Sequence, residues 1–268
     1  MNPLYFGSSQ KALFGIYHQP QGPGRNRGVV LCNPLGEEAI RSHRAYRQLA
    51  TMMARERFHV LRFDYYGTGD SAGDSGDGAT GQWLEDIATA TDELKDISGA
   101  AKVSWVGLRY GATLAIKAAQ RRSDLDRLVL WDPVIDGKLY LRELRDMHVD
   151  FVRAEFAGRH RETNPGAFGH GEEVIGFPLT PALRGEIEMV DLTAIAKCRA
   201  KKVALILSQR TAAHQRFIEH MGTWSSEALV HDIAGGADWN SEEAFSDLAV
   251  SASLVPKELL QAIIDSLA

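Results

Sequence analysis

The chain alternates short apolar runs with stretches of helical periodicity. Continuous apolar runs are typical of strands buried on both faces of a parallel sheet, and the helical stretches between them provide the crossovers. The pattern predicts an α/β fold with a mostly parallel central sheet and helices on both faces. The runs are Gly28–Cys32, His59–Phe63, Lys102–Val106, Arg127–Trp131, Lys202–Leu207 and, more weakly, Ala228–Ile233.

The other periodic segments predict a hairpin at the start of the chain and several core helices. Leu4–Phe6 and Ala12–Tyr17 are two short strands on either side of a Gly-Ser-Ser-Gln turn. Apolar residues three and four positions apart indicate the helices. The helices cover Ser42–Arg57, Thr80–Ile97, Gly111–Arg121 and Pro256–Leu267.

About 70 residues separate the fourth parallel strand from the fifth, which is far more than one crossover requires. Gly137–Gly158 has the pattern of a long amphipathic helix, and Ala182–Cys198 is again helical in character. Between them, Arg159–Pro181 is rich in Gly, Pro and His. An excursion of this kind usually forms a lid or a binding element. We expect a small helical cap, inserted before the last two strands, that divides the chain into core 1–136, cap 137–198 and core 199–268.

Composition narrows the choice of partners and compartment. Hydrophobic residues make up 44% of the chain and charged residues 24%, which is ordinary for a globular protein. A net charge of −5 and a pI near 6.0 give no reason to expect nucleic acid or an anionic membrane as a partner. No signal peptide or membrane span is visible, and Cys32 and Cys198 form no disulfide or metal-binding pattern. We expect a cytoplasmic, soluble protein without metal or cofactor.

Three motifs follow one another along the chain, at Val29–Glu38, Asp64–Ser71 and Val106–Ala112. Together they resemble motifs of α/β-hydrolases of the monoglyceride-lipase and serine-aminopeptidase kind. Val29–Glu38 stands where that family has a strand followed by its oxyanion loop. Asp64–Ser71 matches the family's D-x-x-G-x-G-x-S, and Val106–Ala112 occupies the place of the G-x-S-x-G nucleophile elbow. The resemblance covers roughly the first 120 residues. It implies the α/β-hydrolase fold.

A closer likeness is to the hydrolase-like proteins described as exosortase-A-associated. Those proteins have a similar acidic loop, an arginine-rich start to the next helix, and G-L-R-x-G-A at the elbow. The resemblance implies that an arginine at the elbow is the property of a subgroup. The residues that carry it are Pro34, Glu37, Glu38, Arg41, His43, Arg44 and Gly107–Ala112.

Arg109 occupies the elbow position at which a working hydrolase has its nucleophilic serine. A guanidinium stays cationic and cannot attack a carbonyl. The other triad positions also depart from the family, because Ser208–Ala213 contains no acid and Gly235–Trp239 contains no histidine. His231 lies too early to replace that histidine. The sequence therefore predicts that the serine triad is absent.

What remains at the elbow is a candidate anion site. A helix that begins at Tyr110 would present free backbone N–H groups, and Arg109 adds a two-pronged donor suited to carboxylate or phosphate. Alternatively, Arg109 pairs with Glu37 or Glu38 and fills the former pocket. Both interpretations are compatible, since a substrate can exchange for an internal carboxylate.

Glu38 and His43 are the candidates for acid–base chemistry beside Arg109. Either group would serve as a general acid or base if burial moved its pKa toward neutrality. The alternatives are a helix-N-terminal carboxylate for Glu38 and a solvated first-turn residue for His43. Substrate contacts are expected from Leu35, Glu37, Tyr110, Asp132, His148 and Trp239.

Several other residues have structural explanations. Asp64 is expected to organise its own loop, and Asp132 to have a structural or a substrate-contacting role. Cys32 lies within a strand, so it is a poor candidate for a substitute nucleophile. Phe151 and Phe156, with His148, either line a ligand cavity or simply form the packed face of the cap helix.

These features leave two main hypotheses for function. The first is an enzyme of small-molecule metabolism or biosynthesis that uses Arg109 with Glu38 or His43 on a substrate bearing a carboxylate, acyl or thioester group. Its reaction would be elimination, cyclisation, acyl transfer or hydrolysis by an activated water. The second is a non-catalytic protein that binds such a ligand or an acyl group on a carrier protein. A conventional serine esterase or peptidase is disfavoured by Arg109.

Overall fold

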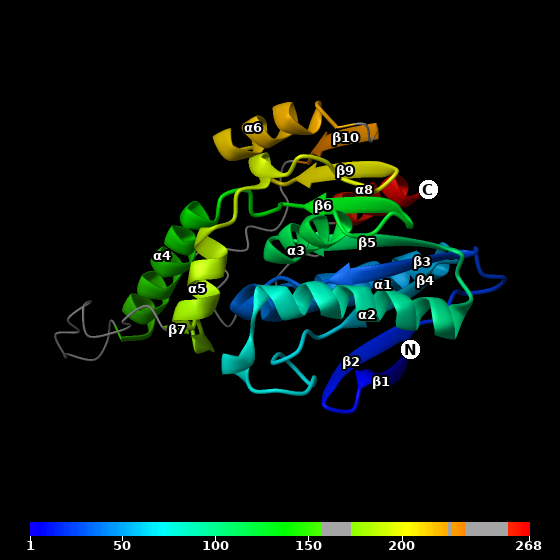
Figure 1. Cartoon of the computed structure of the whole chain (residues 1–268), viewed down its shortest axis with the longest axis horizontal. Coiled ribbons are helices and arrows are strands. Elements are labelled where there is room, and N and C mark those ends of the chain that lie inside the picture. The colour runs from blue at the N-terminus through cyan, green and yellow to red at the C-terminus, as the bar shows by residue number, and fades with distance from the viewer. Residues whose placement is uncertain (157–172, 225–226, 234–256) are drawn as a thin grey trace.

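An eight-stranded sheet forms the centre of the protein (Figure 1). The computed structural model describes residues 1–156, 173–224, 227–233 and 257–268. The strand order is β1-β2-β4-β3-β5-β6-β9-β10, in which β1 and β2 are antiparallel to their neighbours and every pair from β4 to β10 is parallel. The strands are β1 Asn2–Ser8, β2 Lys11–His18, β3 Arg27–Cys32, β4 His59–Phe63, β5 Lys102–Leu108, β6 Leu125–Trp131, β9 Lys202–Leu207 and β10 Glu227–Asp232.

Helices cover both faces of this sheet, as the sequence predicts (Figure 1). α2 and α3 pack on one face, and α1 and α8 pack on the other. None of the helices that the structure describes is both long and apolar enough to cross a membrane. The core helices are α1 Gly36–Arg55, α2 Thr80–Ser98, α3 Tyr110–Ala119, α6 Ala212–Met221 and α8 Lys257–Leu267, with a 3₁₀ turn η1 at Ser75–Asp77.

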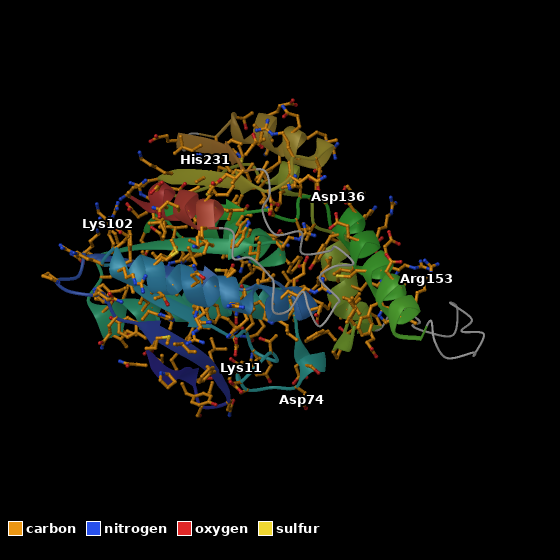
Figure 2. The ribbon with its side chains drawn as sticks, turned by 180° about the vertical axis from the view of Figure 1, so that it is seen from behind. Lys11, Asp74, Lys102, Asp136, Arg153 and His231 are labelled. Atoms are coloured by element: carbon orange, nitrogen blue, oxygen red, sulfur yellow. The ribbon has the colours of Figure 1, made fainter. Side chains whose placement is uncertain are left out.

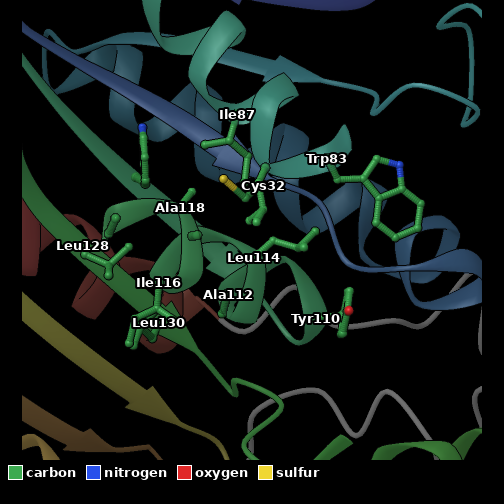
Figure 3. Close-up of a cluster of buried hydrophobic side chains, with 14 of the residues drawn as sticks. Cys32, Trp83, Ile87, Tyr110, Ala112, Leu114, Ile116, Ala118, Leu128 and Leu130 are labelled. Atoms are coloured by element: carbon green, nitrogen blue, oxygen red, sulfur yellow. The ribbon is translucent and has the colours of Figure 1, made fainter. Parts of the chain in front are cut away.

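Successive side chains of each strand point to opposite faces of the sheet, which produces a separate hydrophobic core on each face. In β3, Val30 and Cys32 face α2 and α3, whereas Val29 and Leu31 face α1 and α8. Figure 3 shows Cys32 in the first of these cores with Ile87 of α2. The parallel strands are therefore buried on both sides, which is why they read as continuous apolar runs.

The cap consists of α4 Gly137–Phe156, β7 Glu173–Val174, β8 Phe177–Pro178 and α5 Pro181–Glu188. It lies at the end of the molecule toward which the parallel strands run (Figure 1). The start of α4 packs so closely on the end of α5 that a Cβ on Gly137 would lie 1.7 Å from the carbonyl oxygen of Ile187. The boundaries of the cap at residues 136 and 198 remain predictions.

The predicted hairpin, strands and fold class are confirmed, and two predicted helices need correction. α1 begins at Gly36, six residues before Ser42, and its N-cap residue Leu35 offers no side-chain cap. The usual polar signal for a helix start is thus missing. Ala182–Cys198 is not one helix: α5 ends at Glu188, and only the 3₁₀ turn η2 Leu192–Ala194 follows.

Candidate functional site

The elbow predicted around Arg109 forms between β5 and α3. Arg109 has φ 51° and ψ −122°, a backbone conformation that residues other than glycine rarely adopt. Its backbone N–H donates to the Trp131 carbonyl at 2.9 Å. The flanking glycines are sterically required, because a Cβ on Gly107 would lie 2.5 Å from Ala112 Cα and one on Gly111 would lie 2.3 Å from the Asn33 carbonyl oxygen. The backbone is that of a hydrolase elbow with a different side chain.

The Arg109 side chain bridges the core and the cap. Its Nε donates to Glu38 Oε1 of α1 at 2.8 Å, its Nη2 pairs with Glu143 of α4, and its guanidinium lies 5.4 Å from the centre of the Tyr140 ring. Only 12% of the side chain is exposed. Burial opposes the charge, yet Glu38 and Glu143 raise the pKa of Arg109 above its ordinary value, so it is a permanent cation.

Glu38 is the partner of Arg109, and Glu37 is not. Glu38 is 1% exposed, and its second oxygen, Oε2, accepts a hydrogen bond from the Tyr140 hydroxyl at 2.7 Å. Burial and the Glu38 carboxylate raise the pKa of Tyr140, which therefore stays a donor. Glu37 instead pairs with Arg41 at 3.2 Å on the same helix. Glu38 also lies in the first turn of α1, so both structural interpretations of it apply at once.

A cavity of about 810 Å³ lies beneath the cap. The core contributes Leu35 and Trp83 to its wall, and the cap contributes Leu144 and Phe177. Its size and mostly apolar wall are typical of small-molecule sites. Neither Arg109 nor Glu38 is among its lining residues, so the closed elbow and the open cavity are neighbouring but distinct.

His43 belongs to this cavity and does not join Arg109. It lines the wall together with Glu37, Arg62 and Asp64. His43 is exposed to solvent on its other side, as the alternative interpretation expected. Partial burial and the positive charge of Arg62 lower its pKa, which favours a neutral imidazole at physiological pH. The polar residues that the sequence placed in one pocket are thus divided: Glu38 is with Arg109, His43 and Glu37 line the cavity, and Arg44 is exposed.

A second cavity, of about 640 Å³, has the elbow residue in its wall. It is lined by Arg109 and by Asp132, whose carboxylate accepts hydrogen bonds from the Ser208 backbone N–H at 2.8 Å and from the Ser208 hydroxyl at 2.6 Å. Burial raises the pKa of Asp132. Asp132 has a positive φ of 41°, and these bonds hold the strained loop between β6 and α4 to the end of β9.

His214 and Ser208 line this second cavity, although no sequence motif points to them. His214 is buried at the start of α6, where its Nδ1 lies 2.9 Å from the Thr211 hydroxyl and its Nε2 lies 3.3 Å from the Pro133 carbonyl oxygen. Burial lowers the pKa of His214. The Thr211 contact belongs to a capping box in which Thr211 is the N-cap and His214 takes the place of the usual Glu or Gln.

The other predicted site residues are distributed as follows. Tyr110 is fully buried, 2.9 Å from the Thr80 hydroxyl, and stacks on Tyr140 with ring centres 5.9 Å apart. His148, half-buried on α4, accepts a hydrogen bond from the Ile175 N–H at 3.0 Å. These contacts fix the cap to the core and to its own hairpin. Trp239 and the Phe156 side chain lie outside the described residues.

The residues expected to be structural have structural contacts. Asp64 accepts a hydrogen bond from the Asp70 N–H at 3.1 Å, which organises the glycine-rich loop after β4. Cys32 is fully buried, and burial raises the pKa of its thiol to about 12, which leaves it protonated. His231 is exposed on β10 at one edge of the sheet (Figure 2).

Comparison with known proteins identifies the family. The family model described as serine aminopeptidase, S33, matches residues 13–164, more than half of the chain. The chain belongs to this family. A search of curated proteins found no match. The likeness to exosortase-A-associated proteins remains a prediction.

Solved structures of the same fold cover almost the whole chain. Est1E from Butyrivibrio proteoclasticus with ferulic acid bound is 16% identical, with a TM-score of 0.64 over 98% of this chain and 99% of Est1E. A putative hydrolase from Agrobacterium vitis is 17% identical, with a TM-score of 0.61 over 100% and 98%. Mouse alpha/beta hydrolase domain-containing protein 10 is 18% identical, with a TM-score of 0.58 over the full length of both chains. These likenesses confirm the α/β-hydrolase fold.

Proposed function

We propose that this member of the S33 family is an enzyme of small-molecule metabolism that does not use a serine triad. The observation that carries the proposal is the side chain at the elbow, where Arg109 is held by Glu38 and covered by Tyr140. A guanidinium in that position has no nucleophilic lone pair. In support, residues 208–213 after β9 contain no acid, and residues 234–256 contain no histidine.

The proposal can be tested with a fluorophosphonate probe, which labels activated serines. The full-length protein should remain unlabelled at probe concentrations that label a serine hydrolase assayed in parallel. Labelling is read by mass spectrometry of the intact protein. Stoichiometric modification of a serine would contradict the proposal, and the modified peptide would identify the nucleophile.

We place the substrate in the 810 Å³ cavity, with an apolar body against the cap. His43 is the acid–base residue that the cavity supports, because it lines the wall as a neutral imidazole. Glu38 is less available, since both its oxygens already accept hydrogen bonds. The reaction class is elimination, cyclisation, acyl transfer or hydrolysis by activated water.

The location of the ligand can be tested by filling the cavity. Ala39 lines it from the first turn of α1, so Ala39→Trp should weaken binding of a simple apolar probe, 1-octanol, by at least about tenfold. Arg55→Trp places the same side chain on the exposed last turn of α1 and serves as the control. Isothermal titration calorimetry measures both. Equal affinities for the two variants would show that the probe binds elsewhere.

The second candidate is a binding protein without catalysis. The hydrogen bonds that Glu38 accepts from Arg109 and Tyr140 favour this candidate, because they make the elbow a closed structural element. In this version a substrate carboxylate, free or on a carrier-protein arm, would exchange for Glu143, whose side chain is 48% exposed. The two candidates differ in one respect: only an enzyme has turnover to lose when His43 is replaced by glutamine.

A further inference from the structure

Arg62 on β4 is a buried cation that faces the 810 Å³ cavity. Only 8% of the residue is exposed, yet it lines the cavity wall. Buried arginines are normally paired, because an uncompensated charge in the interior is costly. The partners of Arg62 therefore indicate whether its charge is structural or is directed at a ligand.

Within the described part of the chain, Arg62 makes one hydrogen bond, from its Nε to His18 Nε2 at 3.2 Å. Its two Nη groups have no acceptor there, and no carboxylate lies within ion-pair distance. Asp64 acts on it only through space, and its carboxylate already accepts the Asp70 N–H. Arg109 differs in that its charge is shared between two carboxylates.

The groups around Arg62 do not neutralise it. His18 is 3% exposed, and burial with the charge of Arg62 lowers the pKa of His18 to about 4, so it is neutral at physiological pH. Arg47 on the neighbouring helix adds a further positive charge. Burial lowers the pKa of Arg62, as expected for a cation without a close counter-ion. Carboxylates also line the cavity, at Glu37, Asp64, Asp70 and Asp74, but none of them forms an ion pair with Arg62 in the described part of the chain. The wall on the cap side is apolar.

We infer that Arg62 binds the carboxylate of the ligand through its two free Nη groups, while the apolar body of the ligand lies against the cap. A guanidinium edge with two N–H donors matches a carboxylate in a bidentate arrangement. The inference rests on the proposed use of this cavity and specifies the class of molecule: a carboxylic acid with an apolar chain or ring. It transfers the anion-binding role from Arg109 to Arg62.

The test compares octanoate with 1-octanol, which have the same apolar chain and differ in the carboxylate. The wild-type protein should bind octanoate at least about tenfold more tightly than octanol at neutral pH in isothermal titration calorimetry. Arg62→Gln should abolish this preference and leave octanol affinity unchanged. Arg47→Gln, an exposed neighbour on α1, should retain the preference.

Each contrary outcome has a distinct meaning. If the wild-type protein binds neither probe, the proposed use of the cavity fails. If it binds both equally, or if Arg62→Gln keeps the preference, the role of Arg62 is overturned and the cavity assignment stands. If Glu143→Gln tightens octanoate while Arg62→Gln has no effect, Arg109 is the anion site. Tighter binding of octyl phosphate than of octanoate would overturn the choice of carboxylate.

Thermal melting should show no loss of stability in Arg62→Gln, because the variant removes an uncompensated buried charge.

Discussion

Replacing Gly111 with alanine should lower the free energy of unfolding by more than about 3 kcal/mol, a large part of the stability of a typical domain. The new Cβ would lie 2.3 Å from the carbonyl oxygens of both Cys32 and Asn33. These are backbone atoms at the end of β3, so they cannot move aside as a flexible side chain would. The elbow could then form only if α3 shifted away from the sheet. Denaturant unfolding followed by circular dichroism measures the loss.

Gly81 provides a matched control, since it is also the second residue of a helix. A Cβ at Gly81 meets nothing within 4 Å. Gly81→Ala should leave stability unchanged or raise it by up to about 1 kcal/mol, because alanine favours the helix. If the two variants lost similar stability, close packing at the elbow would not be the reason for glycine at position 111.

The hydrophobic pattern predicted most of the fold because the parallel strands are buried on both faces. The strained backbone at Arg109 was also predictable, since Gly107 and Gly111 are needed for the turn whatever side chain stands between them. The family motif thus carries backbone geometry even where the chemistry has changed. For the same reason, the motif alone did not reveal what Arg109 contacts.

The choice between Glu37 and Glu38 depended on where α1 begins. Once the helix starts at Gly36, Glu38 shares a face with the buried Ser42 and Leu49, and Glu37 lies toward Arg41. A prediction that started the helix at Ser42 left both glutamates in a loop without a defined face. The missing N-cap signal at Leu35 therefore hid the main contact of the elbow as well as the helix start.

The burial of Arg62 was not predictable, because the sequence of its strand has no unusual feature. In a His-Val-Leu-Arg-Phe run, an arginine is expected to point toward solvent or to extend past an edge. The residue is buried because β4 lies between β2 and β3, where Arg62 pairs with Ile16 on one side and Leu31 on the other. The hairpin that brings β2 beside β4 is far from the elbow in sequence, and no motif connects them.

Replacing Glu38 with alanine should have the second large effect, a loss of about 3 to 5 kcal/mol in the free energy of unfolding. The change would leave the buried guanidinium of Arg109 with Glu143 alone and deprive the Tyr140 hydroxyl of its acceptor. Both unsatisfied groups lie where the cap meets the core, so the cap should also become more susceptible to proteolysis. Chemical denaturation and limited proteolysis measure the two effects.

Glu37→Ala is the comparison for this variant, because Glu37 occupies the same helical turn and pairs with Arg41, and its side chain is 22% exposed against 2% for Glu38. Its loss should be smaller than that of Glu38→Ala, about 1 to 2 kcal/mol, because solvent reaches the Glu37 carboxylate. A second comparison separates the buried charge from packing: Glu38→Leu combined with Arg109→Met and Tyr140→Phe replaces the whole network by apolar groups and should recover most of the stability. If Glu38→Ala cost no more than Glu37→Ala, the Arg109–Glu38 pair would not hold the elbow closed, and Arg109 would be free to bind an external anion.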